Sequence, residues 1–207
     1  MATSKLIVIL GPTGVGKTDF SLSLAHRLST VIVSADARQV YREMKIGTAP
    51  PDERQLAEVP HYFIGTHSIH EHYTAGKYEL DALAVLEKLF ISHPVVVLAG
   101  GSGLYIDAVC YGMDDFPETD LSLRTTLTKR LQTEGIESLR FQLKQLDETS
   151  YHAIDLKNPQ RVMRALEICL STGKPYSEWK TGAIKKRPFE IIKIGLQRPR
   201  EELYARI

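Results

Sequence analysis

The feature that most constrains the fold is the run Gly-Pro-Thr-Gly-Val-Gly-Lys-Thr at residues 11–18. It matches the phosphate-loop pattern, in which a glycine and four free positions precede Gly-Lys-Thr. The apolar run Leu6–Leu10 precedes it as a buried strand would, and residues 19–28 carry apolar side chains at helical spacing. A loop between a strand and a helix directs backbone N–H groups and the positive helix end at an anion. The sequence therefore predicts an α/β fold with an anion site after its first strand.

Each residue of this loop has an expected part in holding phosphate. The side chain of Lys17 is long enough to reach a terminal phosphate, and the hydroxyl of Thr18 suits a magnesium ion. The predicted phosphate-binding set is the whole loop: Gly11, Pro12, Thr13, Gly14, Val15, Gly16, Lys17 and Thr18. The loop alone does not distinguish ATP from another phosphorylated ligand.

Two further apolar runs, Val31–Val33 and Val95–Ala99, predict strands of the same parallel sheet. Asp36 follows the first of them. Ligands of open parallel sheets bind beyond the carboxyl ends of the strands, which places Asp36 near the phosphate loop. A carboxylate there can hold magnesium through water, accept a proton as a general base or cap a helix, and the residues alone leave these open.

The turn Gly100-Gly101-Ser102-Gly103 follows the third strand. Its glycines allow a ligand to approach the backbone closely, and Ser102 has the only side chain in the turn that can form a hydrogen bond. That hydroxyl can contact a ligand or cap the next helix. The strand has no terminal Asp, so the usual acidic magnesium partner of phosphate-loop ATPases is missing, which argues against an ATPase or GTPase.

A change of composition near residues 112–118 predicts a domain boundary, and residues 121–170 follow a helical pattern. We expect an α/β core over residues 1–115, a basic helical insertion over 116–187, and a return strand with the start of a core helix over 188–207. Residues 121–187 hold 13 Lys and Arg against 7 Asp and Glu, although the net charge of the chain is only +1. A polyanion site with Arg161 and Arg164 on one helix face fits this surplus, and so does a solvated basic face.

Several other classes of protein are disfavoured. The two cysteines, Cys110 and Cys169, lie far apart, which indicates a reducing compartment and no zinc site. The four histidines between residues 61 and 72 do not have zinc spacing. The chain has no apolar run of membrane-spanning length and no signal-peptide pattern, so we expect no membrane contact and a cytoplasmic location.

Together these motifs resemble those of the tRNA dimethylallyltransferases, the isopentenyl (IPP) transferase family. The phosphate loop alone is unspecific, but the ordered set is highly specific. The matching stretches run in the family order along nearly the whole chain: residues 11–18, 34–36, 39–42, 46–49, 59–61, 100–105, 160–161, 164–167 and 195–196. The family usually has Ser, Lys and Thr where this chain has Ala37, Pro50 and Ser102. Family members are also longer, so we expect further helices after Ile207 to complete the core.

The resemblance implies a P-loop NTPase-like parallel sheet flanked by helices, with an inserted helical subdomain. It implies that the loop, with Mg²⁺ at Thr18, holds dimethylallyl diphosphate rather than ATP. The dimethylallyl group then passes to N6 of the adenosine next to the anticodon of tRNA, at position 37. Asp36 is the implied general base, and Lys17 and Ser102 complete the implied catalytic set. The implied contacts with the anticodon stem-loop are Asp36, Ala37, Arg38, Gln39, Ser102, Gln160, Arg161, Val162, Met163 and Arg164. We expect a monomer.

Three alternatives remain open at this point. The related enzymes that prenylate free AMP, ADP or ATP share the loop and the chemistry, but a basic helical module favours tRNA. A phosphate-loop kinase for small molecules would consume ATP, and the missing acid on the third strand argues against it. An inactive tRNA-binding fragment would bind a stem-loop in a salt-dependent way and make no product.

Overall fold

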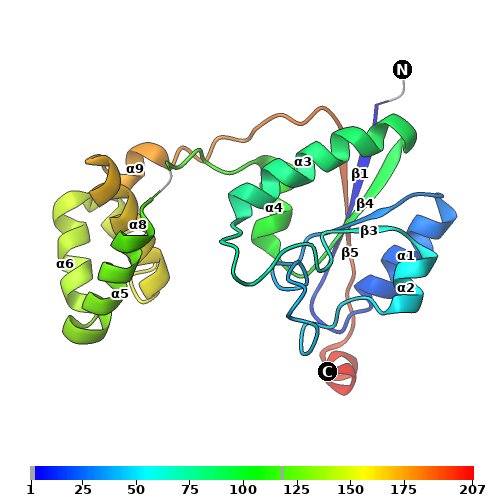
Figure 1. Cartoon of the computed structure of the whole chain (residues 1–207), viewed down its shortest axis with the longest axis horizontal. Coiled ribbons are helices and arrows are strands. Elements are labelled where there is room, and N and C mark those ends of the chain that lie inside the picture. Colours follow the sequence, from blue (N-terminus) through cyan, green and yellow to red (C-terminus); the bar gives the residue numbers. More distant parts are fainter. Residues whose placement is uncertain (1–2, 118) are drawn as a thin grey trace. The chain divides into compact units, whose positions relative to one another are not determined.

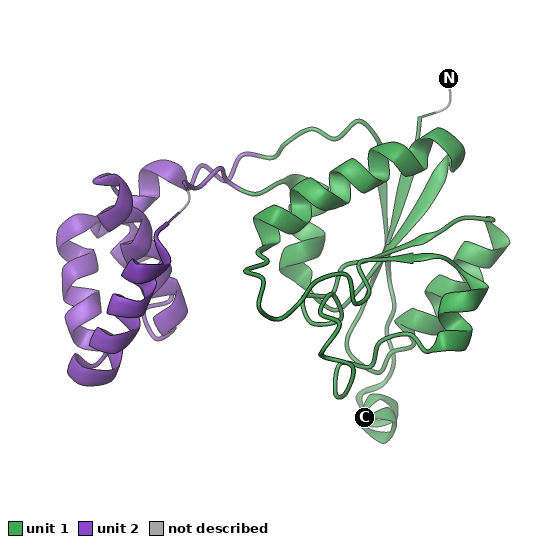
Figure 2. Ribbon diagram, in the orientation of Figure 1, with its two compact units in different colours: residues 1–113, 184–207 green, residues 114–183 purple. Residues whose placement is uncertain are grey.

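The computed structural model describes residues 3–117 and 119–207, and the chain divides into two compact units (Figure 2). Unit 1 consists of residues 1–113 and 184–207, and unit 2 of residues 114–183. Glu118, the last residue of the segment in which we expected a boundary, lies outside the described residues, as do Met1 and Ala2. Each unit has its own hydrophobic core and is described by itself.

Unit 1 is built on a five-stranded parallel sheet with the strand order β3-β2-β4-β1-β5 (Figure 1). The parallel α/β fold predicted from the sequence is confirmed. The segment 59–64 contributes only a two-residue strand at the sheet edge. The strands are β1 (Lys5–Leu10), β2 (Ile32–Ser34), β3 (His61–Tyr62), β4 (Val95–Ala99) and β5 (Glu190–Gly195).

Helices cover both faces of this sheet because successive strand side chains point to opposite sides. In β1, Leu6 and Val8 pack into the core that also contains residues of α3 and α4, whereas Ile9 packs with Leu22 and Ala25 of α1. All three β1 side chains are fully buried, which explains the apolar run that precedes the phosphate loop. The helices of unit 1 are α1 (Lys17–Arg27), α2 (Glu53–Glu58), α3 (Ala75–Ser92), α4 (Gly103–Tyr111) and α10 (Arg200–Arg206).

A buried ion pair joins the two segments of unit 1 that lead to and from unit 2. The Glu79 carboxylate on α3 accepts hydrogen bonds from Nη2 of Arg187 at 2.8 Å and from the backbone N–H of Met113 at 2.8 Å. The Arg187 guanidinium also donates to the carbonyl oxygens of Ala108 and Val109 at the end of α4. Both side chains of the pair are almost completely buried, at 5% and 7% exposure.

We expect Arg187→Leu to lower the free energy of unfolding by about 3 kcal/mol, because it leaves a buried carboxylate without its main cation. Urea unfolding followed by circular dichroism measures the change. The matched control is Arg54→Leu, which removes an exposed i,i+4 pair with Glu58 (3.3 Å) and should cost at most about 1 kcal/mol. Equal losses for both variants would contradict a stabilising role of the buried pair.

Unit 2 is helical throughout its core, as the periodicity over residues 121–170 predicts. Leu127, Leu139, Leu143 and Leu166 come from three different helices and are buried together. Helix α8 begins where the Asn158 side chain accepts hydrogen bonds from the next backbone N–H groups. The helices are α5 (Leu121–Glu134), α6 (Ile136–Leu146), α7 (Glu148–Ala153), α8 (Pro159–Thr172) and α9 (Tyr176–Trp179).

The expected positive charge of the helical module is not a property of unit 2 as a whole. Lys185, Lys186 and Arg187, which contribute to the surplus over residues 121–187, belong to unit 1. Residues 114–183 carry 10 Lys and Arg against 11 Asp and Glu. Any attraction of unit 2 for a polyanion must therefore come from a local cluster of cations. Within the described residues, no helix has the length and apolar character needed to cross a bilayer.

Candidate active site

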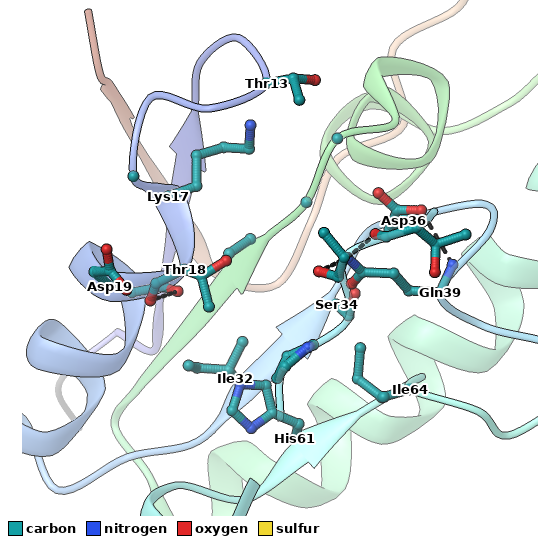
Figure 3. Close-up of a pocket in the computed structure, with 18 of the residues that line it drawn as sticks. Thr13, Lys17, Thr18, Asp19, Ile32, Ser34, Asp36, Gln39, His61 and Ile64 are labelled. Atoms are coloured by element: carbon teal, nitrogen blue, oxygen red, sulfur yellow. Dashed lines mark hydrogen bonds between the residues drawn. The ribbon is translucent and has the colours of Figure 1, made fainter. Parts of the chain in front are cut away.

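A cavity of about 350 Å³ lies beyond the carboxyl ends of the central strands of unit 1 (Figure 3). Its walls come from the phosphate loop, from the segment after β2 and from the glycine turn after β4, with contributions from β3 and α10. The predicted site residues that line it are Thr13, Gly14, Gly16, Lys17, Thr18, Asp36 and Gln39. This is the position that ligands take in open parallel sheets.

The phosphate loop brings the Lys17 ammonium to this cavity. Its Nζ donates hydrogen bonds to the carbonyl oxygens of Gly11 at 2.8 Å and Pro12 at 2.9 Å. Burial lowers the pKa of the Lys17 ammonium, and the Asp36 carboxylate opposes this shift in part. Gly16 has a φ of 101° at the start of α1, a conformation that favours glycine. The Val15 side chain is buried, so only its backbone is available to a ligand.

Asp36 both lines the cavity and holds its own loop in place. Its Oδ1 accepts hydrogen bonds from the backbone N–H groups of Arg38 at 2.9 Å and Gln39 at 3.2 Å. Its Oδ2 faces the turn after β4, where a Cβ placed on Gly101 would lie 2.9 Å away. No hydrogen bond reaches Oδ2 from the residues that the structure describes. The carboxylate therefore caps a turn, not a helix, and one of its oxygens is available to a ligand.

Ser102 lies outside the cavity lining and supports the Asp36 turn. Its Oγ accepts a hydrogen bond from the backbone N–H of Ala37 at 2.8 Å, and its own N–H donates to the carbonyl of Ala35 at 3.1 Å. Ser102 precedes α4 but its side chain makes no capping hydrogen bond. The two bonds fix the segment after β2 to the turn after β4.

Gly100 allows this close approach, because a Cβ at that position would lie 2.2 Å from the carbonyl oxygen of Ala35. We expect Gly100→Ala to push the two segments apart and to displace Asp36. Overpacking of this kind costs about 1–3 kcal/mol, and a displacement of about 1 Å at a catalytic group can reduce activity about 100-fold. Thermal unfolding and the rate of the prenyl transfer that the resemblance implies measure the two effects.

Gly103 provides the matched control for this substitution. A Cβ there meets nothing within 4 Å, and the residue lies in the first turn of α4. Gly103→Ala should leave both unfolding and transfer close to the original values. If Gly100→Ala behaves like Gly103→Ala in both measurements, the close approach of the two segments is not required.

The remaining predicted residues of the segment after β2 differ in their surroundings. Gln39 lines the cavity, and its Nε2 donates to the carbonyl oxygens of Thr48 at 2.9 Å and Ala49 at 3.0 Å. Arg38 is exposed and Ala37 is half-buried. The segment therefore offers a ligand one carboxylate, one restrained amide and one exposed cation.

The predicted contact residues on α8 divide into exposed and core positions. Gln160 and Arg161 are exposed and Arg164 is half-buried. Val162 and Met163 are 0% and 2% exposed and belong to the core of unit 2. Both side chains point to the core side of the helix, and the predicted tRNA contact of these two residues stays a prediction.

Arg206 and His61 are among the cavity-lining residues that were not predicted as site residues. Arg206 of α10 lines the cavity and donates from Nε to the carbonyl of Gly14 at 2.8 Å. Arg206 and Gly14 are 192 positions apart in the chain, so only the fold brings Arg206 to the loop. His61 also lines the cavity. Burial lowers the pKa of its imidazole, and Nδ1 lies 2.7 Å from the Val59 carbonyl.

The parallel sheet, the phosphate loop between β1 and α1 and the cavity beyond the strand ends define an α/β protein of the P-loop NTPase-like class. Within that class, the model of the family described as IPP transferase matches residues 39–207. The chain belongs to the IPP transferase family, which confirms the family indicated by the sequence motifs.

Named relatives agree with this placement. The chain is 54% identical over 98% of its length to "tRNA dimethylallyltransferase 1" of Phocaeicola vulgatus, of which it covers 67%. It is 52% identical over 100% of its length to the protein of the same name from Bacteroides fragilis, of which it covers 69%. The chain thus spans about two thirds of the length of these curated relatives, which are named as transferase enzymes.

Solved structures support the fold. A crystal structure of the tRNA isopentenylpyrophosphate transferase from Bacillus halodurans matches 98% of this chain with a TM-score of 0.60 and 33% identity, and the match covers 63% of that protein. A eukaryotic dimethylallyltransferase acting on tRNA matches 99% of this chain with a TM-score of 0.78 and 24% identity, over 51% of its own length. The second match shows a common fold.

Proposed function

We propose that this chain transfers a dimethylallyl group from dimethylallyl diphosphate to N6 of the adenosine next to the anticodon, at position 37 of tRNA. One observation carries the proposal: an intact phosphate loop and the Asp36 carboxylate line the same cavity in a chain of this family. The names of the relatives give the substrate class. We propose that the chain acts as a monomer in the cytoplasm, and sedimentation velocity measures its oligomeric state.

The loop side of the cavity suits the departing pyrophosphate. The bond between the prenyl carbon and the diphosphate oxygen breaks, and negative charge grows on the leaving group. Lys17, the loop N–H groups and Arg206 are positive groups at this side of the cavity, and preorganised charges of this kind stabilise a transition state.

Magnesium fits this site as a partner of the substrate. Among the described residues, no group of three or more His, Cys, Asp and Glu is arranged to hold a metal ion. Mg²⁺ commonly keeps water ligands and binds through substrate phosphates and one or two protein oxygens, of which the Thr18 hydroxyl can supply one. When bound, the ion would neutralise charge on the diphosphate.

The opposite side of the cavity suits the amine. The adenine must leave its stack to present N6 to a pocket, as bases do in other base-modifying enzymes. A new bond forms between N6 and the prenyl carbon, and N6 loses a proton. We propose that Asp36 accepts this proton at Oδ2, because Oδ1 already accepts two backbone hydrogen bonds. Ser102 contributes by fixing the Asp36 turn.

A prenyl-transfer assay with labelled dimethylallyl diphosphate tests the proposal. An anticodon stem-loop with adenosine at position 37 competes with AMP, ADP and ATP, and Mg²⁺ is present or removed with a chelator. We expect label in the RNA, dependent on Mg²⁺. Label in the free nucleotide instead of the RNA would indicate one of the related adenylate-prenylating enzymes. Consumption of ATP would indicate a kinase. Binding of the RNA without any labelled product would indicate an inactive fragment.

A further inference from the structure

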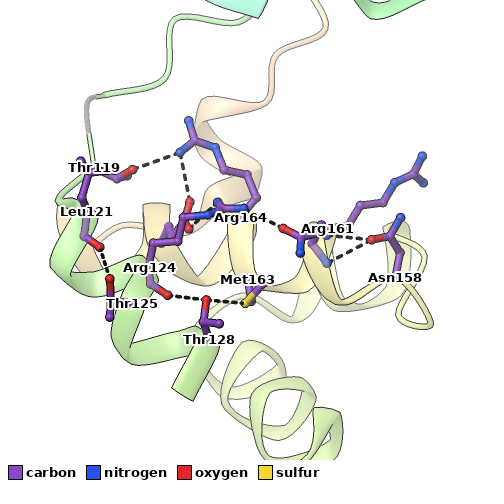
Figure 4. Close-up of polar contacts among 11 residues, drawn as sticks. Thr119, Leu121, Arg124, Thr125, Thr128, Asn158, Arg161, Met163 and Arg164 are labelled. Atoms are coloured by element: carbon purple, nitrogen blue, oxygen red, sulfur yellow. Dashed lines mark hydrogen bonds and ion pairs between the residues drawn. The ribbon is translucent and has the colours of Figure 1, made fainter. Parts of the chain in front are cut away.

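A buried carboxylate in unit 2 holds two half-exposed arginines side by side (Figure 4). Glu167 of α8 is 1% exposed. Its Oε1 lies 2.7 Å from Nη1 of Arg124 on α5, and its Oε2 lies 3.3 Å from Nη1 of Arg164 on α8. Each arginine side chain remains 41% exposed. The carboxylate is thus inside the unit while both guanidinium groups reach its surface.

Further bonds fix the orientation of each guanidinium. Nη2 of Arg124 donates to Oε1 of Gln160 at 2.6 Å. Nη1 of Arg164 also donates to Oγ1 of Thr119 at 3.2 Å, and its guanidinium lies over the ring of Phe116 at 5.7 Å. Within the described residues, Nε of Arg124 and both Nε and Nη2 of Arg164 have no hydrogen-bond partner. These N–H groups are available to a ligand.

The groups left over on this surface are hydrogen-bond donors. The Gln160 oxygen accepts from Arg124, so its amide presents N–H groups outward. Arg161 is exposed, and its side chain reaches away from the network without a partner among the described residues. Three arginines and one glutamate give this cluster a charge of +2, whereas the unit as a whole carries 10 Lys and Arg against 11 Asp and Glu. A donor-only, positive surface matches the oxygens of phosphate groups.

We propose that Arg124 is a further RNA-phosphate contact and that Glu167 is the positioning residue that holds Arg124 and Arg164 for it. The identity of the RNA, an anticodon stem-loop, rests on the proposed function. Arg124 lies on a different helix from the contacts that the sequence predicts, so the contact surface extends from α8 onto α5.

The first experiment compares two glutamine substitutions on the same helix. Arg124→Gln removes the proposed contact. Arg130→Gln is the matched control, because Arg130 of α5 also donates to a glutamine (Gln142 Oε1, 2.6 Å) and to a glutamate (Glu134 Oε2, 3.3 Å). Stem-loop dissociation constants of the full 207-residue chain are measured at several salt concentrations.

We expect Arg124→Gln to raise the dissociation constant about 10-fold, as loss of a charged hydrogen bond does. It should also reduce the slope of log K against log salt by about 0.7–0.9, the value for one phosphate contact. Arg130→Gln should change neither. Identical binding and slope for the two variants would overturn the assignment of Arg124.

A second experiment separates positioning from net charge. Glu167→Gln removes a negative charge, so a role through charge alone predicts tighter binding to RNA. The positioning role predicts binding weakened about 5-fold, because one amide oxygen cannot hold two guanidinium groups as a carboxylate does. Thermal unfolding of this variant reports its folding, and tighter binding by the folded protein would overturn the role of Glu167.

A failure of this inference can be distinguished from a failure of the proposed function. Prenyl transfer by the original chain is measured in parallel. If that chain modifies the stem-loop while Arg124→Gln behaves like Arg130→Gln, only the inference fails. If the original chain neither binds nor modifies the stem-loop, both fail.

Discussion

Asp36→Asn is expected to reduce the rate of prenyl transfer by about 10²–10⁴-fold, the usual contribution of a general base. The substitution is informative because it changes the chemistry and preserves the turn. The Asn oxygen can accept the two hydrogen bonds that Oδ1 receives from Arg38 and Gln39. What is lost is the oxygen that accepts the proton. The affinity for dimethylallyl diphosphate should change little, so the effect should appear in kcat.

The matched control is the same substitution at a carboxylate with a similar structural task. Asp52 caps α2 by accepting a hydrogen bond from the backbone N–H of Gln55 at 2.8 Å, and it does not line the cavity. Asp52→Asn should leave kcat unchanged because Asn is an equally good cap. Single-turnover transfer to the stem-loop measures both variants. An Asp36→Asn protein that retains the original rate would rule out Asp36 as the base.

Lys17→Met is expected to reduce kcat/KM for dimethylallyl diphosphate by about 10²–10³-fold, the range seen when one charge-stabilising group is removed from an active site. The ammonium lines the cavity and lies within hydrogen-bond distance of two loop carbonyls, so its position is defined. Methionine keeps much of the length of the side chain and removes only the charge and its donors. Loss is expected in diphosphate affinity as well as in kcat.

The pH dependence of kcat/KM provides a second measurement. Burial lowers the pKa of Lys17, so the free protein loses this positive charge at a less alkaline pH than an exposed lysine would. The alkaline limb of the profile should therefore lie below the usual lysine range and should disappear in Lys17→Met. Lys77→Met is the control, because Lys77 also donates to a backbone carbonyl (His72, 3.2 Å) but does not line the cavity. If Lys17→Met keeps the pH profile and the transfer rate of the original chain, the proposed role of Lys17 is contradicted.

Local sequence signals predict much of unit 1. The apolar runs before residue 11 and at 95–99 form the central strands β1 and β4, and the loop between β1 and α1 lies at the cavity. These predictions succeed because a strand buried on both faces requires a continuous apolar run, and a phosphate loop requires glycines at fixed spacing. The position of Asp36 at the cavity follows from the rule that parallel strands end at the same edge of the sheet.

The contacts between distant segments were not predictable in the same way. Arg206 reaches Gly14 across 192 positions, and Ser102 supports Ala37 across 65. The spacing of Arg161 and Arg164 predicted that both lie on one helix face, but it did not show that the buried Glu167 pairs with Arg164 and with Arg124 of another helix. The periodicity also did not show that Val162 and Met163 face the core.

By itself, the sequence determined the family, the parallel α/β fold and the phosphate loop, because each depends on residues that are neighbours or regularly spaced along the chain. The tertiary structure alone decided which polar groups remain available to a ligand. It assigned Oδ1 of Asp36 to a turn and left Oδ2 at the cavity, and it paired Arg124 and Arg164 with one carboxylate. The physical reason is that hydrogen bonds and burial depend on distances in space, which folding sets between residues far apart in the chain.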